Sequence, residues 1–327
     1  VHTRDSRQLW GERYNRQLSE LLQVENEITS TIARTLQVEL AGGSSALPAR
    51  RNTSDPEAYR LYLKGREFTT GTRREMDKAI EYFQQAISLD SDYALAYAGL
   101  ADAYTTQSYL RGSEREVTLS KARSAASMAM ELDPGLPEAF TASGMIKLVF
   151  DLDFAGAEAD LKKGPELGPG LHETVMHYGD FLLLTGRYDE AMAKYQHAIK
   201  LDPLSVIAAH DIGLTYLMMG EHEECAASFK MAIDFNPNWT WGHVKLALNY
   251  SRMGKCEEAL AAAEDAEELL VGSDTPATRS WLGYTYARCD QVDKATAALA
   301  TMMEMAGKEY ADPVLFAIPH LGLRDLD

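Results

Sequence analysis

Small and aromatic residues recur through the middle of the chain at an interval of 34 residues. Within residues 172–237, five pairs share this interval: Gly179/Gly213, Gly186/Gly220, Tyr195/Phe229, Ala198/Ala232 and Pro203/Pro237. A small residue lets two helices approach each other, and an aromatic side chain fills the space beside them. Asp-Pro or Asn-Pro then ends the second helix, because proline cannot continue it. The pattern predicts successive helical hairpins stacked as a solenoid.

These segments resemble tetratricopeptide repeats (TPR), a family of 34-residue helix–turn–helix units. The resemblance implies an all-α, right-handed superhelix (an α-solenoid) in which first helices line a concave groove and second helices face outward. Glycine or alanine anchors predict about seven repeats, and these anchors lie at positions 65, 101, 144, 179, 213, 247 and 283. Residues 314–320 resemble the first helix of an eighth repeat, which is truncated because the sequence ends at Asp327.

Two repeats depart from the regular pattern. Residues 105–121 of the second repeat hold about nine more residues than a regular turn, so both of its helices are expected to be longer. In the third repeat Gly164 stands in the alanine position and Pro165 follows it. Since proline inside a helix costs about 3 kcal/mol, we expect a kink or an early stop there. The array itself is expected to start at an N-cap followed by proline, Asp55-Pro56.

The sequence ahead of the repeats divides into two segments. Residues 1–40 are expected to hold the end of an upstream domain and an amphipathic helix over 18–40, whose apolar stripe should pack on another apolar surface. Residues 9–40 resemble the end of a TolB-like domain, found between a signalling module and TPR repeats in some bacterial proteins. That resemblance rests on Leu9, Trp10, Glu12, Tyr14, Arg16, Leu18, Glu25, Glu27 and Ile28. Residues 41–54 are typical of a flexible linker, and 55–327 form the TPR array.

Composition and charge restrict the class of partner. The net charge of −17 disfavours nucleic acid, and no apolar run approaches the length of a membrane span. The first residues are neither a signal peptide nor a natural start, so we expect a piece of a longer protein. Cys225 occupies the small-residue position of its repeat and is predicted to be buried and inert. Without a CxxC pair among the three cysteines, a reducing compartment, the cytoplasm, is the default location.

The sequence contains no motif of a catalytic nucleophile, a kinase, a cofactor site or a metal site. His210 and His243 hold nearly equivalent positions in adjacent repeats, so a metal pair is conceivable, but lining a groove is the favoured role. We therefore expect no catalytic residues, no cofactor and no metal in this chain.

The family's groove positions predict where a partner binds. In repeats four to seven they give Met176, Asp180, His210, Leu214, Trp241, Val244, Leu248 and Tyr284, with Arg288 just beyond. The Lys and Asn residues with which TPR clamps hold a C-terminal carboxylate are absent. These residues predict an apolar groove with few charges, suited to an apolar segment or helix of a protein partner. Trp241 is the expected centre of binding, although packing against Trp239 explains it equally well, while Asp180 and Arg288 would orient the segment.

Three functions remain open on the sequence alone. The leading hypothesis is a non-catalytic scaffold that binds a peptide or helix in its concave groove. In the alternative, the chain is the sensory or docking arm of a larger bacterial signalling enzyme, a Ser/Thr kinase or nucleotide cyclase, whose catalytic domain lies upstream. The third is self-association through residues 18–40 or the truncated C-terminus.

Overall fold

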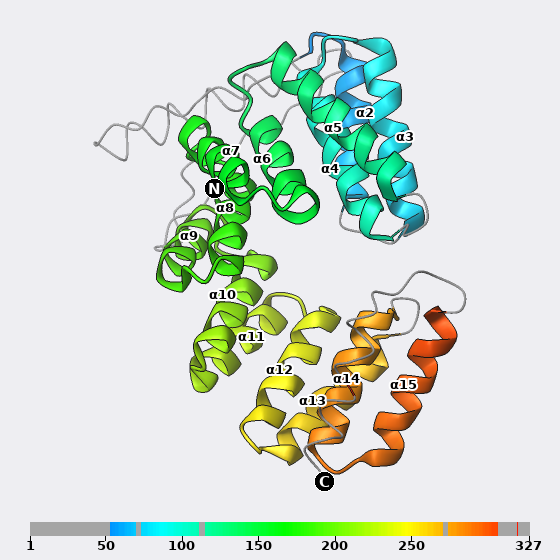
Figure 1. Cartoon of the computed structure of the whole chain (residues 1–327), viewed down its shortest axis with the longest axis vertical. Coiled ribbons are helices and arrows are strands. Elements are labelled where there is room, and N and C mark those ends of the chain that lie inside the picture. The colour runs from blue at the N-terminus through cyan, green and yellow to red at the C-terminus, as the bar shows by residue number, and fades with distance from the viewer. Residues whose placement is uncertain (1–52, 70–72, 111–114, 271–273, 307–318, 320–327) are drawn as a thin grey trace, which may run out of the picture.

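The computed structural model describes residues 53–69, 73–110, 115–270, 274–306 and 319 (Figure 1). These residues form fourteen α-helices and one π-helical turn, and none of them lies in a strand. The elements are α2 (Pro56–Glu67), α3 (Arg73–Leu89), α4 (Ala94–Leu110), α5 (Arg115–Leu132), α6 (Pro137–Ile146), η3 (Lys147–Asp151), α7 (Phe154–Leu167), α8 (His172–Leu184), α9 (Tyr188–Leu201), α10 (Val206–Met219), α11 (His222–Phe235), α12 (Thr240–Arg252), α13 (Cys256–Leu269), α14 (Pro276–Arg288) and α15 (Val292–Ala306).

The helices form seven consecutive pairs, from α2/α3 to α14/α15, stacked along a curved path (Figure 1). The predicted all-α solenoid of seven repeats is therefore confirmed. The predicted helix over 18–40, the TolB-like segment and residues 41–52 of the linker lie outside the described residues. Of the predicted eighth repeat, only Pro319 is described, and it lies against Gly283 of α14.

Close contact between glycine and an aromatic ring holds each central pair together. A Cβ atom on Gly179 would lie 2.6 Å from the Tyr195 ring, and one on Gly213 would lie 2.7 Å from Phe229. Both rings are fully buried. The complementary small and large positions predicted from the 34-residue interval are thus real contacts, and any larger residue at either glycine would push the two helices apart.

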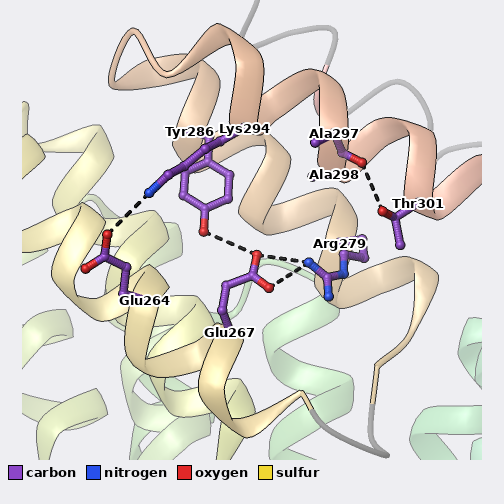
Figure 2. A pocket seen from close by; sticks show the side chains of 8 residues that line it. All are labelled: Glu264, Glu267, Arg279, Tyr286, Lys294, Ala297, Ala298 and Thr301. Carbon is purple, nitrogen blue, oxygen red and sulfur yellow. Dashed lines mark hydrogen bonds and ion pairs between the residues drawn. The ribbon is translucent and has the colours of Figure 1, made fainter.

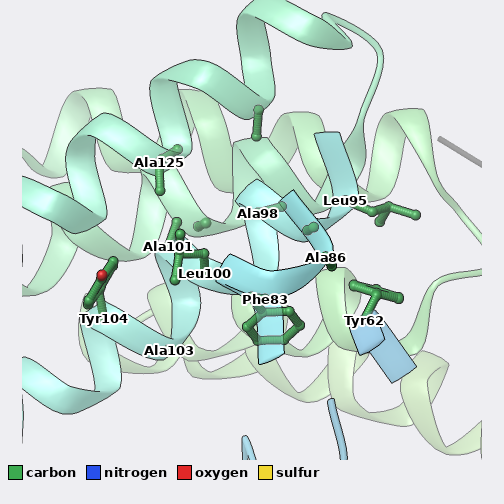
Figure 3. Close-up of a cluster of buried hydrophobic side chains, with 14 of the residues drawn as sticks. Tyr62, Phe83, Ala86, Leu95, Ala98, Leu100, Ala101, Ala103, Tyr104 and Ala125 are labelled. Atoms are coloured by element: carbon green, nitrogen blue, oxygen red, sulfur yellow. The ribbon is translucent and has the colours of Figure 1, made fainter. Parts of the chain in front are cut away.

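The first two repeats share one such ring between them. Phe83 of α3 lies against both Gly65 of α2 and Gly99 of α4, where added Cβ atoms would approach it to 2.6 Å and 2.8 Å. Figure 3 shows Phe83 near Tyr62 in this cluster of buried side chains. A single second helix therefore packs against the first helices on both sides of it, which makes the core continuous from one repeat to the next.

The start of the array and its long second repeat agree with the sequence predictions. Asp55 caps α2, because its Oδ1 accepts hydrogen bonds from the backbone N–H groups of Glu57 and Ala58 at 2.8 Å and 3.0 Å. The second repeat has helices of 17 and 18 residues, whereas α8 and α9 have 13 and 14.

Of the kink or early stop predicted at Pro165, the early stop is wrong. Helix α7 continues through Pro165 to Leu167 and has 14 residues, as many as α9. Pro165 stands in the last turn of α7, which ends at Leu167. The backbone hydrogen bond that proline removes is therefore lost only at the end of the helix. Packing holds this last turn in place: Leu161 is fully buried, and a Cβ on Gly164 would lie 2.8 Å from the Thr141 hydroxyl of α6.

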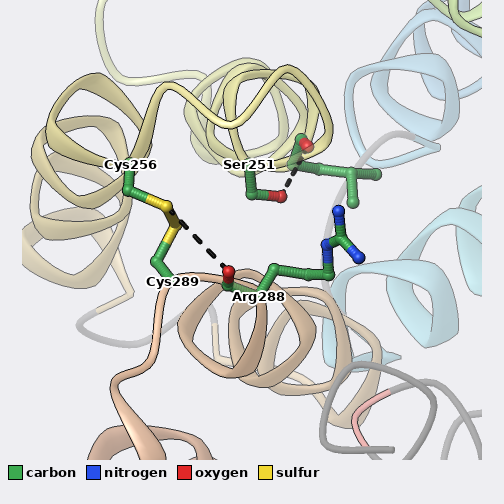
Figure 4. Close-up of a disulfide and its surroundings, with 5 residues drawn as sticks. Ser251, Cys256, Arg288 and Cys289 are labelled. Atoms are coloured by element: carbon green, nitrogen blue, oxygen red, sulfur yellow. Dashed lines mark hydrogen bonds between the residues drawn. A yellow bond between two sulfur atoms is a disulfide. The ribbon is translucent and has the colours of Figure 1, made fainter. Parts of the chain in front are cut away.

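Two of the three cysteines form a disulfide between repeats six and seven. Cys256 is the first residue of α13, and Cys289 directly follows α14 (Figure 4). The sequence analysis did not predict this disulfide, whereas Cys225 is a buried free thiol as predicted. Helices α13 and α14 pack less extensively than the second helix and following first helix of any other consecutive repeats described. The disulfide therefore joins two helices that otherwise contact each other little, while α12 and α14 supply most of the packing between repeats six and seven.

Candidate interaction surface on the inner face

Equivalent positions on four consecutive first helices form one row of side chains. The residues two positions before Gly179, Gly213, Ala247 and Gly283 are His177, Asp211, Lys245 and Trp281. They lie on α8, α10, α12 and α14, so the row runs from one repeat to the next. We call the surface that carries this row the inner face.

An ion pair shows that first helices of distant repeats face each other across the inner face. The Arg66 guanidinium of α2 binds the Glu173 carboxylate of α8, although 107 residues separate them in sequence. Glu173 lies one helical turn before His177, on the same side of α8. First helices from repeats one and four therefore meet across the interior of the curve.

Four carboxylates from three first helices gather there, and we call them the acidic cluster: Asp102 of α4, Glu173 and Asp180 of α8, and Asp211 of α10. The Asp180 carboxylate accepts a hydrogen bond from the Tyr195 hydroxyl at 2.9 Å and lies 3.3 Å from His177 Nδ1. The Asp211 carboxylate lies 3.0 Å from His210 Nδ1. The side chains of Asp180 and Asp211 are thus oriented by neighbours while their negative charges remain on the inner face.

The acidic cluster shifts the protonation of the groups around it. Partial burial opposes the charged form of His177, but the hydrogen bond and charge of Asp180, with Asp102 nearby, outweigh it and raise the pKa to about 9. Burial raises the pKa of Asp211 to about 6, and Asp180 adds to this against the opposing hydrogen bond from His210. The raised pKa of His177 reports a negative local potential, whereas the raised pKa of Asp211 comes mainly from burial.

Repeats six and seven line the same face differently. The Lys245 ammonium of α12 lies 4.1 Å from the ring centre of Trp281 on α14 and 5.4 Å from that of Trp241, one turn earlier on α12. We call these three side chains the tryptophan–lysine platform. Burial, with a smaller contribution from Arg252, lowers the pKa of Lys245 to about 8. Among the described residues no carboxylate lies within ion-pair distance of this ammonium.

The predicted binding residues divide into two sets. Met176, Val244 and Leu248 are 4 %, 0 % and 1 % exposed, so they belong to the core and do not reach the surface. The others are half-buried on the first helices: Asp180, His210, Leu214, Trp241, Tyr284 and Arg288. The expectation of an apolar groove with few charges is wrong for repeats one to five, where charged side chains occupy the inner face.

Sequence reasoning missed the row formed by His177, Asp211, Lys245 and Trp281. The family's usual groove positions omit it, but the 34-residue interval joins the first three members and a 36-residue interval joins the fourth. Reading every position at the repeat interval, polar positions included, would have found this row.

The two histidines of equivalent position have different surroundings. His210 contacts Asp211 and lies beside the rings of Phe229 and Trp239. His243 Nε2 lies 3.1 Å from the Pro237 carbonyl oxygen. In the part of the chain that the structure describes, no group of three or more His, Cys, Asp or Glu side chains has the arrangement of a metal site.

A cavity of about 360 Å³ lies between α13, α14 and α15 (Figure 2). Its charged side chains bind one another: the Glu267 carboxylate accepts hydrogen bonds from Arg279 at 2.7 Å and 2.9 Å, and Glu264 lies 3.3 Å from Lys294. Tyr286 donates a 3.3 Å hydrogen bond to Glu267. The cavity is lined by repeats six and seven alone, whereas side chains from repeats one, two, four and five meet on the inner face.

Models of the tetratricopeptide repeat match two parts of the chain. One, described as "TPR repeat", covers residues 179–220, and the other, described as "Tetratricopeptide repeat", covers residues 72–93. The chain is built of tetratricopeptide repeats. The fold agrees with solved structures: a tetratricopeptide repeat protein from Parabacteroides merdae has a TM-score of 0.53 at 17 % identity, covering 82 % of this chain and all of that one. Human IFIT1, solved with m7Gppp-AAAA, has a TM-score of 0.66 at 14 % identity, covering 90 % of this TPR chain and 67 % of IFIT1.

Two curated relatives match shorter segments of this TPR protein. The transcriptional regulator HilA of Salmonella typhimurium is 25 % identical over 149 residues, 45 % of this chain and 27 % of HilA. The putative adenylate cyclase 3 of Rhizobium meliloti is 32 % identical over 97 residues, 28 % of this chain and 16 % of the cyclase. The matched segment is thus less than a third of either relative. None of the described helices has the length and apolar character that a bilayer crossing requires.

Proposed function

We propose that this TPR chain is a non-catalytic docking module that binds a segment of a partner protein along its inner face. The observation that carries the proposal is the convergence of side chains from α2, α4, α8 and α10 on one interior space. Side chains from several repeats can then contact one continuous segment, which is how a solenoid obtains an extended binding surface.

The charge of this surface indicates the chemistry of the segment. Asp180 and Asp211 hold negative charge on adjacent first helices, and the whole chain carries a net charge of −17. A segment with lysine or arginine side chains would stabilise the charged form of Asp211, which burial and, to a smaller extent, the charge of Asp180 disfavour. The partner is therefore expected to be basic where it meets repeats two to five, in place of the apolar segment predicted from the sequence.

Selection from a random peptide library tests this proposal without knowledge of the partner. Purified chain is used as bait, and the recovered peptides are measured by fluorescence anisotropy against the chain and its variants. We expect enrichment in lysine and arginine, and a loss of affinity of at least about tenfold in Asp180→Asn/Asp211→Asn, since the loss of even one charge-assisted contact costs about 1.5–3 kcal/mol.

The matched control is Glu264→Gln/Glu223→Gln, which removes the same number of charges from exposed positions on α13 and α11. This control separates local contacts from the effect of net charge. Equal loss of affinity in both double variants would contradict binding at the inner face, as would recovery of no peptides with net positive charge.

One observation favours a second role: the match to a putative adenylate cyclase. In that role the same surface belongs to the docking arm of a larger signalling enzyme, and the catalytic domain lies elsewhere in the parent protein. The coding sequence upstream of Val1 is the test, because an adjoining cyclase or kinase domain would support this role and an unrelated open reading frame would contradict it.

A further inference from the structure

We propose that the tryptophan–lysine platform is a separate subsite of the inner face that binds a carboxylate side chain of the partner segment together with an adjacent apolar side chain. This inference rests on the proposed function, because the platform would bind one end of the same partner segment. Trp241, Lys245 and Trp281 would form the subsite, with the charge of Arg252 nearby.

The first argument is the unsatisfied charge at the platform. Lys245 Nζ lies between two indole rings, 4.1 Å and 5.4 Å from their centres. Nothing in the described residues forms an ion pair with it, although it is partly removed from water. An ammonium in this position favours an incoming anion, because the anion restores interactions lost on leaving water. Its lowered pKa, caused mainly by burial, agrees with this, since a bound negative charge would raise the pKa toward its ordinary value.

The second argument is the distribution of charge along the row. Moving from repeat four to repeat seven, the row reads His177, Asp211, Lys245 and Trp281. Five residues after each anchor, a second row reads Leu184, Met218, Arg252 and Arg288. Cations therefore gather in repeats six and seven, while the acidic cluster of repeats two to five would repel an anion. A segment with acidic residues at one end and basic residues at the other matches this distribution in one orientation only.

The third argument concerns the class of macromolecule. The platform presents one ammonium between two indoles, which suits a single carboxylate beside a hydrophobic side chain. A nucleic acid instead requires a series of cationic contacts along its backbone. Here the neighbouring repeats present Asp180 and Asp211, which would oppose a phosphate chain.

The experiment repeats the peptide selection on the chain and on Lys245→Met, which keeps the aliphatic stem between the indoles and removes the charge. We expect Asp or Glu next to an apolar residue in peptides from the unmodified chain, and loss of that acidic position in peptides from Lys245→Met. A labelled peptide is then compared with its Glu→Gln twin: the substitution should weaken binding about tenfold on the chain and leave binding to Lys245→Met unchanged. Lys245→Arg, which keeps the charge, should retain a large part of the discrimination.

The matched control is Lys194→Met, since Lys194 makes a similar contact, 5.2 Å from the Tyr178 ring centre, but lies on a second helix. Thermal melts of all variants identify any loss of folding. Equal Glu/Gln discrimination on the chain and on Lys245→Met would overturn the subsite, even if Asp180→Asn/Asp211→Asn still weakens binding and so leaves the proposed function intact. Tight binding of a labelled single-stranded oligonucleotide, lost in Lys245→Met, would also overturn it and assign the platform to nucleic acid.

Discussion

Repeats four and five carry His177 and Asp211 at the positions where repeats six and seven carry Lys245 and Trp281. The backbones of these repeats are alike, with helices of 13 or 14 residues from α8 to α14. In the first region ionisable side chains are satisfied by one another, as in the pairs His177–Asp180 and His210–Asp211. In the second, the Lys245 ammonium lies over two indole rings and forms no ion pair within the part of the chain that the structure describes.

This comparison separates the positions that make the fold from those that make the surface. Gly179 and Gly213 must be small because the rings of Tyr195 and Phe229 lie within 2.6–2.7 Å of where a Cβ would stand. Residues two positions earlier have no such restriction of volume, so each repeat can carry a different charge there. A solenoid can thus vary the chemistry of its inner face repeat by repeat while its packing stays constant.

Phe229→Ala is expected to have the largest effect, because it removes the ring that packs α11 against α10 in repeat five. The ring is fully buried against Gly213, and glycine has no side chain with which to fill the space. Replacement should lower the free energy of unfolding by about 3–5 kcal/mol, measured by urea denaturation followed by circular dichroism. Gln196→Ala, exposed on α9, is the control and should change little. A loss below about 1 kcal/mol would mean that the repeats collapse into the cavity more easily than this packing implies.

Reduction of the disulfide should affect the second region more than the first. Cys256 and Cys289 close a loop of 33 residues across the loosely packed α13–α14 junction, so loss of the bond should cost about 2–4 kcal/mol. Hydrogen exchange with and without reductant should show faster exchange in α14 and α15, and unchanged exchange in α8 to α10.

Cys289→Ser is the control for this experiment, because reductant should have no further effect on it. A reductant effect of similar size in Cys289→Ser, or one spread evenly over all repeats, would contradict a local role for the disulfide.

The difference between the regions also explains how far the sequence could predict this molecule. The helix pairs follow from complementary side-chain volumes, a small residue on one helix and an aromatic ring on the other. Gly213 and Phe229 make this visible in the sequence, because a glycine and an aromatic residue recur at the repeat interval. Contacts that do not follow the interval could not be found in this way. Arg66 and Glu173 meet only because the array curves, and the spacing of Cys256 and Cys289 gave no reason to join them. Trp241 was predicted from its position, but its partner Lys245 lies at a position that the family's groove pattern omits.

Opposite pH dependence is expected for the two regions. Asp211, with a pKa of about 6, faces His210, Asp180 and His177. It loses its charge as pH falls, so a basic peptide should bind on the order of fivefold more weakly at about pH 5 than at about pH 7. His177 stays protonated over this range because its pKa is about 9. Lys245, with a pKa of about 8, loses its charge as pH rises, so an acidic peptide should bind more weakly at about pH 9.5 than at about pH 7.

Anisotropy titrations at these pH values measure both effects, and each has its own control variant. Asp211→Asn should abolish the loss of basic-peptide affinity at low pH and leave the loss of acidic-peptide affinity at high pH unchanged. Lys245→Met should have the opposite effect. If both peptides weakened in the same direction of pH, the two regions would not act as separate subsites.

Arg66→Gln is expected to have the smallest effect, although its partner Glu173 is 107 residues away. Both side chains are well exposed, at 43 % and 57 %, and exposed ion pairs contribute about 0–1 kcal/mol because water and salt screen them. Arg187→Gln is the matched control, since Arg187 also joins neighbouring repeats through Glu158 but lies outside the acidic cluster. Urea denaturation should show the same small loss in both variants, whereas basic-peptide affinity should rise in Arg66→Gln alone, because Glu173 is then free to bind the peptide. A loss of stability well above that of Arg187→Gln would show that the pair holds the curve of the array closed, and the acidic cluster would then be a structural contact instead of a docking surface.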